Sequence, residues 1–281
     1  NRFKVMRNVL MILAHIAIAN VLVAQDTRIS YHENFPSPKP SIREADVMWM
    51  NTVWQRIDLH EKFNQGFYFP TDPGDQNRYS LFDYLKKSLF NDPSFRAFDP
   101  GLLGDDDMFR RPMTKKQLED LFIKVELVST ERLDMPGVWD SIPVRTELSS
   151  ESVLAYEIKE QWFFDKQRSV MDVKILGICP IIRIYDSQTG EFRGEKRLFW
   201  VYLPEARSEM ASWSYFNPRN EYDHLTYDDI FIKRKFHSYI IKTSNVYDRY
   251  IFEYAKGKDA LIEAELEKMK LFNMEHDLWS F

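Results

Sequence analysis

Apolar residues change their spacing twice along the chain, which divides the sequence into three stretches. Residues 41–123 and 204–281 repeat apolar positions with the period of a helix, whereas residues 152–203 alternate apolar and polar side chains as a half-buried strand does. The sequence therefore predicts an α+β fold, with an antiparallel β-meander in the middle of the chain and flanking amphipathic helices, in a single domain over 41–281.

The first helical stretch contains three helix-start signals. In a capping box, a Ser or Thr and a polar residue three positions later satisfy the first free amides of a helix. The pattern occurs at Ser41–Glu44, Ser80–Asp83 and Thr114–Gln117. Beyond the first box, apolar side chains recur at helical spacing, at Met50, Val53, Trp54 and Ile57. We expect a long one-sided helix from Ser41 to about Gly66, followed by a short second helix and a third helix from Thr114.

Three strands joined by short turns are predicted in the middle of the chain. Residues 154–162 and 171–175 alternate, a nearly continuous apolar stretch then runs to Tyr185, and 197–203 follows a turn. Pro180 lacks an amide hydrogen, so the second strand is expected to be bulged there or to lie at an edge.

Two helices are predicted in the last stretch. Thr226 and Asp229 form a fourth capping box, and apolar residues continue at helical spacing as far as Ile240. A terminal helix is expected over 259–279. Three of its apolar residues are expected to face inward, namely Ile262, Leu266 and Met269.

The chain begins with a short apolar run, residues 9–24, behind three basic residues, Arg2, Lys4 and Arg7. This pattern is typical of a secretory signal peptide. The run is too short and too interrupted for a stable membrane span, which needs about 20 predominantly apolar residues. We expect 1–24 to be a signal peptide that is cleaved between Ala24 and Gln25, so that the mature protein is exported and soluble.

Residues 25–40 are polar and contain three prolines, which predicts an extended N-terminal arm with little structure of its own. Such an arm is expected either to project into solvent or to strap onto a neighbouring molecule.

Composition narrows the class of protein. The formal net charge is −5 and becomes more negative when the basic leader is removed, so nucleic acid is a poor candidate for a partner. Cys179 is the only cysteine, which leaves no disulfide framework and no N-terminal lipid attachment site. Aromatic residues make up 15% of the chain, which is enough for a large core and is also typical of protein interfaces.

No pattern in the sequence indicates catalysis, a cofactor or a metal. Phosphate-binding glycine loops and the G-x-S-x-G elbow are absent. Residues 275–277 (Glu-His-Asp) lie on a predicted helix, where consecutive side chains point about 100° apart and cannot converge on one ion. Residues 105–107 lack the spacing of a calcium loop and are read as a solvated charge run. Cys179 lies among isoleucines, which favours a core residue over a nucleophile.

A periplasmic carboxylate-dependent hydrolase is the competing class. Acidic pairs such as Glu160 and Asp165 could flank a glycosidic bond, but nothing in the sequence selects them over the other acids. A pocket with two converging carboxylates, one of them with a raised pKa, would favour this class.

Five blocks of sequence are more specific than these patterns. They are IREADVMWMNTVWQRIDLHEKFNQGFYFP at 42–70, YEIKEQWFFDKQRSVMDVKILGICP at 156–180, LFWVYLPEAR at 198–207, LTYDDIFIKRKFHSYIIKTSNVYDRYI at 225–251 and FNMEHDLW at 272–279. On these blocks the chain resembles the GldN/PorN family of the type IX secretion system, the gliding-associated export machine of Bacteroidetes. His60 stands where relatives usually carry arginine, which changes none of the main expectations.

The resemblance implies a periplasmic structural protein, peripherally associated with the outer membrane. Such a protein assembles with a GldK/PorK-like lipoprotein into a ring beneath the outer membrane, and contacts a GldM/PorM-like protein anchored in the inner membrane. It reaches membranes only through these partners. It is needed for protein export and, in gliding species, for motility. The family implies no catalytic residues.

A cluster of aromatic residues is the predicted partner interface. Four of them gather around a segment broken by Asn217-Pro218, namely Trp213, Tyr215, Phe216 and Tyr222. A regular core element is not expected in such a segment, and aromatic residues are enriched at interfaces. The alternative, that they plug the end of the sheet, stays open.

Overall fold

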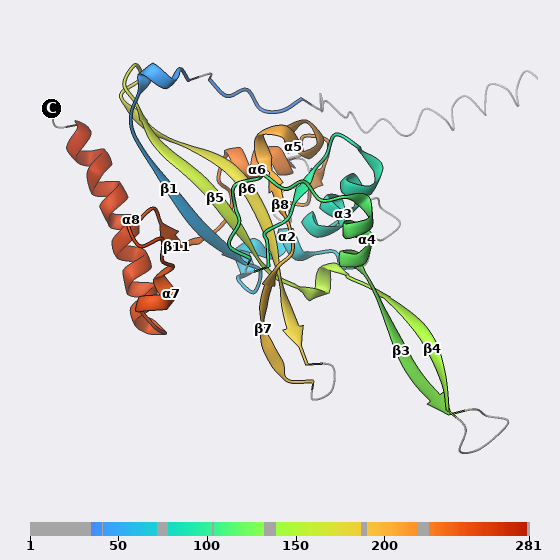
Figure 1. Cartoon of the computed structure of the whole chain (residues 1–281). Helices are drawn as coiled ribbons and strands as arrows, with labels where there is room; N and C mark the ends of the chain where they lie inside the picture. Colours follow the sequence, from blue (N-terminus) through green and yellow to red (C-terminus); the bar gives the residue numbers. More distant parts are fainter. Residues whose placement is uncertain are drawn as a thin grey trace, which may run out of the picture. The chain divides into compact units, whose positions relative to one another are not determined.

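The computed structural model describes residues 35–40, 42–71, 78–102, 104–131, 139–186, 190–217 and 225–279. The expected signal peptide, its cleavage site at Ala24 and Gln25, and the arm as far as residue 34 lie outside these ranges. Residues 35–40 belong to the same unit as the rest of the described chain. A large antiparallel sheet runs through its centre with helices packed around it, which confirms the predicted α+β class (Figure 1).

The central sheet has the strand order β11-β1-β5-β6-β8-β2, and β7 also pairs with β6. Its strands are β1 (Val47–Asp58), β2 (Ala97–Phe98), β5 (Val153–Asp165), β6 (Val170–Tyr185), β7 (Phe192–Arg197), β8 (Trp200–Tyr202) and β11 (Tyr239–Thr243). All neighbouring strands are antiparallel. The meander predicted within 152–203 is therefore present as β5 to β8.

The long helix predicted from Ser41 to Gly66 is wrong, because most of this segment is strand β1. β1 pairs with β5 along its whole length. Val53 and Trp54 are adjacent, yet both are buried, each in a different apolar cluster. Both faces of the strand are covered in its second half, so the apolar residues there do not alternate strictly and their spacing imitates a helix. The 3-10 turn η1 (Glu44–Asp46) begins after Arg43 without a side-chain cap, and Ser41 of the first predicted capping box lies outside the described residues.

The other three capping boxes begin helices as predicted. Ser80 caps α3 (Leu81–Asn91), Thr114 caps α4 (Lys115–Phe122) and Thr226 caps α6 (Tyr227–Ile232). Short elements complete this part of the fold, namely η2 (Lys62–Asn64), α2 (Gln65–Tyr68), η3 (Ser150–Ser152) and α5 (Leu203–Met210). These helices and the sheet share one large apolar core, in which ten or more aromatic rings are in contact.

The C-terminal region departs from its prediction in two ways. The helix after Thr226 ends at Ile232, and residues 239–243 form strand β11. After the short helix α7 (Ile251–Tyr254), the terminal helix α8 (Lys258–Trp279) has the predicted extent. However, α8 packs on β11 through Ala264 and Leu271. The three residues expected to face inward, Ile262, Leu266 and Met269, are between 46% and 57% exposed.

Two hairpins leave the body of the molecule (Figure 1). β3 (Ile123–Glu131) and β4 (Trp139–Glu147) form a separate two-stranded sheet that sequence analysis missed. The ends of β6 and β7 form the second hairpin, with the rings of Tyr185 and Phe192 in contact near its tip. A second two-stranded sheet consists of β9 (Ser214–Tyr215) and β10 (Leu225–Thr226). Within the described ranges, no helix is both long and apolar enough to cross a membrane.

Candidate interaction sites

The aromatic residues predicted as an interface lie mainly in the core. Trp213 is 3% exposed and stacks on Tyr84, with ring centroids 5.4 Å apart. The ring of Tyr215 packs against the core rings of Phe67 and Tyr227. Trp213 has no area left for a partner, so its assignment to an interface is wrong and the plug interpretation holds for it.

Phe216 is the one member of the described part of that cluster with substantial exposure, at 37%. The guanidinium of Arg78 lies over its ring, 3.5 Å from the centroid, in a cation–π contact. Tyr222 lies outside the described residues. A role for Phe216 in binding a partner stays a prediction.

The end of the predicted arm is held by the protein's own helix α6 and strand β6. The side-chain hydroxyl of Ser37 donates a 2.8 Å hydrogen bond to Asp229 in the first turn of α6, and the ammonium of Lys39 donates to the carbonyl of Val173 at 3.0 Å. We call residues 35–40 the strap. The arm was expected to project into solvent or to bind a neighbour, but its described part binds its own domain instead.

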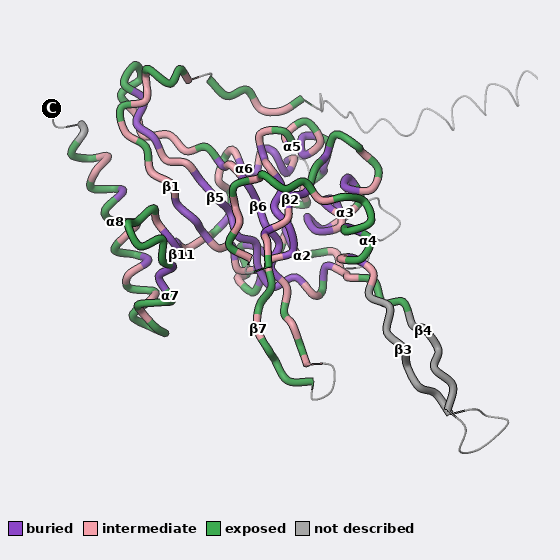
Figure 2. Tube along the Cα trace, viewed as in Figure 1, coloured by how far each residue is buried: buried purple, intermediate pink, exposed green. Residues whose placement is uncertain are grey.

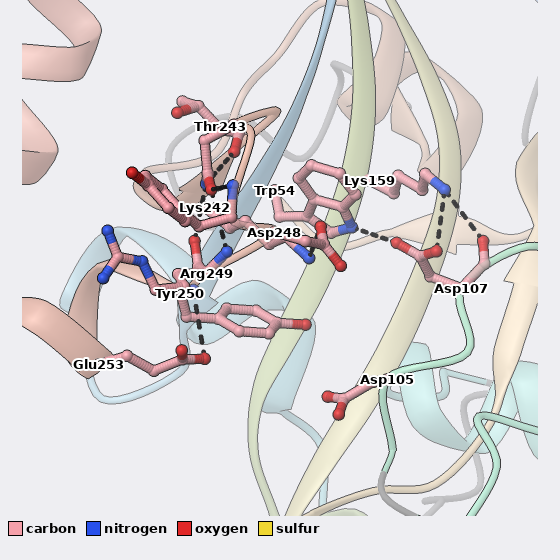
Figure 3. Close-up of polar contacts among 12 residues, drawn as sticks. Trp54, Asp105, Asp107, Lys159, Lys242, Thr243, Asp248, Arg249, Tyr250 and Glu253 are labelled. Atoms are coloured by element: carbon pink, nitrogen blue, oxygen red, sulfur yellow. Dashed lines mark hydrogen bonds and ion pairs between the residues drawn. The ribbon is translucent and has the colours of Figure 1, made fainter.

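A group of charged residues, of which Asp107, Lys159 and Lys242 are largely buried, joins the loop that contains Asp107 to the sheet (Figure 3). Asp107 accepts a 2.6 Å hydrogen bond from the indole N–H of Trp54 and forms a 3.2 Å ion pair with Lys159. The ammonium of Lys242, which pairs with Asp248 at 2.6 Å, lies 4.7 Å from the Trp54 ring centre. The run 105–107 was read as solvated, which is wrong for Asp107. These contacts fix the loop and the β11–α7 connection against the sheet.

A second buried ion pair joins β5 to β7. Glu157 is fully buried, and one of its oxygens, Oε2, accepts a 2.6 Å hydrogen bond from Arg197. Burial raises the pKa of the Glu157 carboxyl, and the nearby Arg197 guanidinium opposes that shift. Arg197 also lies over the ring of Tyr250, 5.0 Å from its centre.

The acidic pair proposed for a hydrolase does not converge. Glu160 accepts hydrogen bonds from Gln55 and Arg234, while Asp165 is held by Arg168. The two acids stand five residues apart on β5, so their side chains leave opposite faces of the strand. In the part of the chain that the structure describes, no three His, Cys, Asp or Glu side chains are grouped to hold a metal.

One pocket does bring two carboxylates together. A cavity of about 500 Å³ beneath α7 and the start of α8 is lined by Glu157 and Glu195 among others. However, Arg56 donates two hydrogen bonds to Glu195, at 2.6 and 2.8 Å, and Arg197 holds Glu157. Each carboxylate thus accepts hydrogen bonds from an arginine, which occupies its oxygens and leaves it poorly placed to transfer a proton to or from a substrate.

Several apolar residues of α8 are exposed to solvent on its outer face. Besides the three residues named above, Leu261 and Phe272 are also exposed on this helix. We call these five residues the α8 stripe. Figure 2 shows α8 with buried positions on one side and exposed positions along much of the rest. Contiguous exposed apolar side chains of this kind mark contact surfaces in many proteins.

These features define an α+β protein whose buried charges are held in structural pairs and whose exposed apolar residues include a group of five along α8. The chain belongs to the GldN family, described as gliding motility associated protein GldN, whose family model matches residues 42–280. The match spans nearly all of the described chain and confirms the resemblance seen in the sequence blocks. No curated protein matches the chain.

Proposed function

We propose that this protein is a structural subunit of the type IX secretion system, exported to the periplasm and peripherally associated with the outer membrane. The observation that carries this proposal is the match to the gliding motility associated GldN family over residues 42–280. Within that machine its role is to assemble into a ring with copies of itself and with a GldK/PorK-like lipoprotein, and to contact a GldM/PorM-like trans-envelope protein.

One feature of the fold, the β3–β4 hairpin, supports a role in assembly. The β3–β4 hairpin pairs with no third strand among the described residues, and a lone two-stranded hairpin is only marginally stable in water. Packing against a neighbouring subunit would stabilise it. Contacts between different surfaces of adjacent copies, such as a hairpin and the body of the next subunit, are the type that closes into rings.

The experiment is a pull-down of the tagged protein from outer-membrane extract, with the mass of the intact complex measured. We expect a complex of many copies that contains the lipoprotein and the trans-envelope protein. A strain without the gene is expected to lose protein export. Recovery of the protein as a monomer from cells that export normally would refute the proposal. N-terminal sequencing of the recovered protein tests cleavage before Gln25, since a chain that retains residues 1–24 contradicts export by a signal peptide.

A carboxylate-dependent hydrolase is the second candidate, favoured by the raised pKa of Glu157 in a pocket that also holds Glu195. We propose that the protein is not an enzyme, because arginine engages both carboxylates. The variant Glu195→Gln separates the two candidates. A structural subunit keeps assembly and export with this change. A hydrolase that uses Glu195 loses export while the complex keeps its normal mass.

A further inference from the structure

Strand β1 has an open edge along its first half. On the side of β11, pairing covers only Val53 to Arg56, and a last hydrogen bond runs from the amide of Ser244 to the carbonyl of Thr52. Among the strands of the described ranges, none pairs with residues 47–51 on that side. We call residues 47–51 the β1 edge. An unpaired edge offers backbone N–H and C=O groups to a strand of another chain.

The β1 edge is accessible and carries little protection against pairing. None of its residues is fully buried, and Met48 and Met50 are 58% and 55% exposed. Its sequence, VMWMN, contains neither charge nor proline, the features that keep many natural edge strands from pairing. The register with β5 shifts at Met48, so the regular part of the edge is 49–51.

The chain after β11 is held in a loop and does not fill the edge. The side chain of Asn245 donates hydrogen bonds to the carbonyls of Thr243 and Arg249, both at 2.9 Å. Asp248 has a positive φ of 52°, and its carboxylate pairs with Lys242 at 2.6 Å (Figure 3). A residue other than glycine keeps such a conformation only where its surroundings hold it. Another segment must therefore supply the strand that completes this edge.

The direction of the backbone groups at Met50 is set by the neighbouring pair. Backbone groups along a strand point alternately to its two sides. Thr52 bonds toward β11, so Met50, two residues earlier, presents its N–H and C=O to the open side. In an antiparallel pair, two residues that exchange both hydrogen bonds lie directly opposite, with their side chains on the same face. An added antiparallel strand therefore places the side chain of its bonded residue beside Met50.

The sequence that precedes the strap has the pattern of a strand. Residues 25–34 lie outside the described ranges and read QDTRISYHEN, in which Thr27, Ile29 and Tyr31 alternate with polar residues. Ten extended residues span about 33 Å. The strap runs from the start of β1 to α5 and α6, whereas the β1 edge lies on the side of β11 (Figure 1). The strap thus leads the arm away from the edge of its own copy.

We propose that residues 27–31 of one copy add as an antiparallel strand to the β1 edge of a neighbouring copy. Ile29 and Tyr31 then donate their amides to β1 and pack on the face that carries Met50. Strand addition of this kind takes its affinity from backbone hydrogen bonds and its specificity from alternate side chains. The contact joins two different surfaces of adjacent copies, which is the type that closes into rings. The inference rests on the proposed self-assembly and names one contact that produces it.

Binding of synthetic peptides to the chain that begins at Phe35 tests the strand directly. We expect a peptide of residues 25–34 to bind and to slow hydrogen exchange of the Met50 amide. A peptide N-methylated at Ile29 and Tyr31 is expected to bind roughly tenfold more weakly or less, because it loses the donors that face β1. The matched control, N-methylated at Arg28 and Ser30, is expected to bind like the unmodified peptide. No binding, protection elsewhere, or equal weakening by the two modifications would overturn the inference.

Sedimentation of longer chains shows whether the strand comes from a second copy. We expect the chain that begins at Gln25 to associate as its concentration rises, and the chain that begins at Phe35 to stay monomeric. Met50→Lys places a charge on the edge and is expected to abolish association, whereas Phe63→Lys, at a residue 56% exposed elsewhere, is expected to leave it unchanged. A monomeric chain from Gln25, even with a protected Met50 amide, overturns the inference. Ring assembly through other surfaces is still judged separately by the pull-down.

Discussion

The backbone amide of Ser37 donates a 2.8 Å hydrogen bond to Oδ2 of Asp228, 191 positions further along the chain. Arg207 on α5 joins the same group of hydrogen bonds. Its guanidinium donates to both oxygens of Asp228, at 2.8 and 3.1 Å, and to the carbonyl of Ser37. The largely buried carboxylate of Asp228 thus joins the strap, α5 and the start of α6. The strap is therefore part of the folded domain.

Removal of the strap is expected to destabilise the domain. A chain that begins at Phe35 keeps the contacts of Ser37 and Lys39, whereas a chain that begins at Ile42 loses them. Hydrogen bonds to charged groups contribute about 1.5–3 kcal/mol each when well formed. We expect the thermal midpoint of the shorter chain to be several degrees lower, because a loss of 1 kcal/mol lowers the midpoint by ~2–4 °C in a domain of this size. Thermal denaturation of the two chains checks this, and equal midpoints would show that the strap adds no stability.

Acid is expected to release the strap. Burial alone would raise the pKa of Asp229, but its hydrogen bonds with Lys233 and Ser37 outweigh burial, and the pKa is lowered. A carboxyl whose pKa is lower in the folded state stabilises the fold above its unfolded pKa of about 3.9, and that contribution is lost as the pH falls through the folded value. We expect the side-chain resonances of Ser37, whose hydroxyl donates to Asp229, to move to their unbound positions only at acidic pH. Asp229→Asn is expected to weaken the contact at neutral pH. The prediction is contradicted if the Ser37 resonances stay unchanged both at acidic pH and in this variant.

The Glu157–Arg197 pair is expected to be costly to break. Arg197→Met leaves a fully buried carboxylate without its partner, which destabilises proteins by about 3–5 kcal/mol. The raised pKa of Glu157 is expected to rise further without the guanidinium. The buried carboxyl then takes up a proton more readily, so the loss is expected to be smaller at pH ~5 than at pH ~8. Urea denaturation of the variant and of the unaltered protein at both pH values measures this loss in the free energy of unfolding.

A matched control distinguishes this pair from ordinary surface charge. Arg96 pairs with Glu205 at 2.6 Å, and both of these side chains are about half exposed. Arg96→Met is expected to change the free energy of unfolding by ~1 kcal/mol or less. An equal loss in both variants would contradict the distinction.

Cys179 is expected to be chemically inert in the folded protein. Its side chain is fully buried next to Trp54 and Trp200, which confirms the predicted burial. Burial, together with the nearby carboxylate of Glu157, raises the pKa of the thiol well above its ordinary range. The thiolate is the reactive form, so labelling by a thiol reagent is expected to be slow in the native state and fast in denaturant. Rapid native labelling, or a dimer on a non-reducing gel, contradicts this.

Local signals in the sequence identified some elements correctly and failed where tertiary context decides. The boxes at Ser80, Thr114 and Thr226 depend on contacts three residues apart, so the sequence alone identifies them. β1 was misread because both faces of its second half are covered, and this covering comes from elements far away in the chain. The outer face of α8 was misread because apolar residues were assumed to face inward, whereas small Ala264 allows α8 to pack closely on β11.

The candidate sites were the least predictable part of the molecule. Glu157 and Lys159 are buried, although they occupy positions that a half-exposed strand would turn toward solvent, so the alternating pattern alone predicted them to be exposed. Their partners, Arg197 and Asp107, come from other elements and are brought near only by the fold. The sequence did contain one signal. The charged residues of β5 are preceded and followed along the strand by apolar residues. This pattern suits a strand in which the face that carries the charges is covered as well.

Trp213 and Phe216 are only three residues apart, and the structure predicts opposite consequences for them. Trp213→Ala removes a ring that stacks on Tyr84 and contacts Phe95, so it is expected to cost about 3–5 kcal/mol of stability. Phe216→Ala removes a partly exposed ring whose main contact is Arg78, and is expected to cost ~1 kcal/mol or less.

Stability and assembly must be measured together to interpret these two variants. If Phe216 contacts a partner, Phe216→Ala is expected to weaken recovery of the complex from outer-membrane extract while the thermal midpoint stays close to that of the unaltered protein. Trp213→Ala is expected to lower both, because an unfolded subunit cannot assemble. A complex of normal yield and mass with Phe216→Ala would exclude this residue as a major contact. The α8 stripe would then be the next surface to alter, with Leu266→Asp placing a charge at its centre.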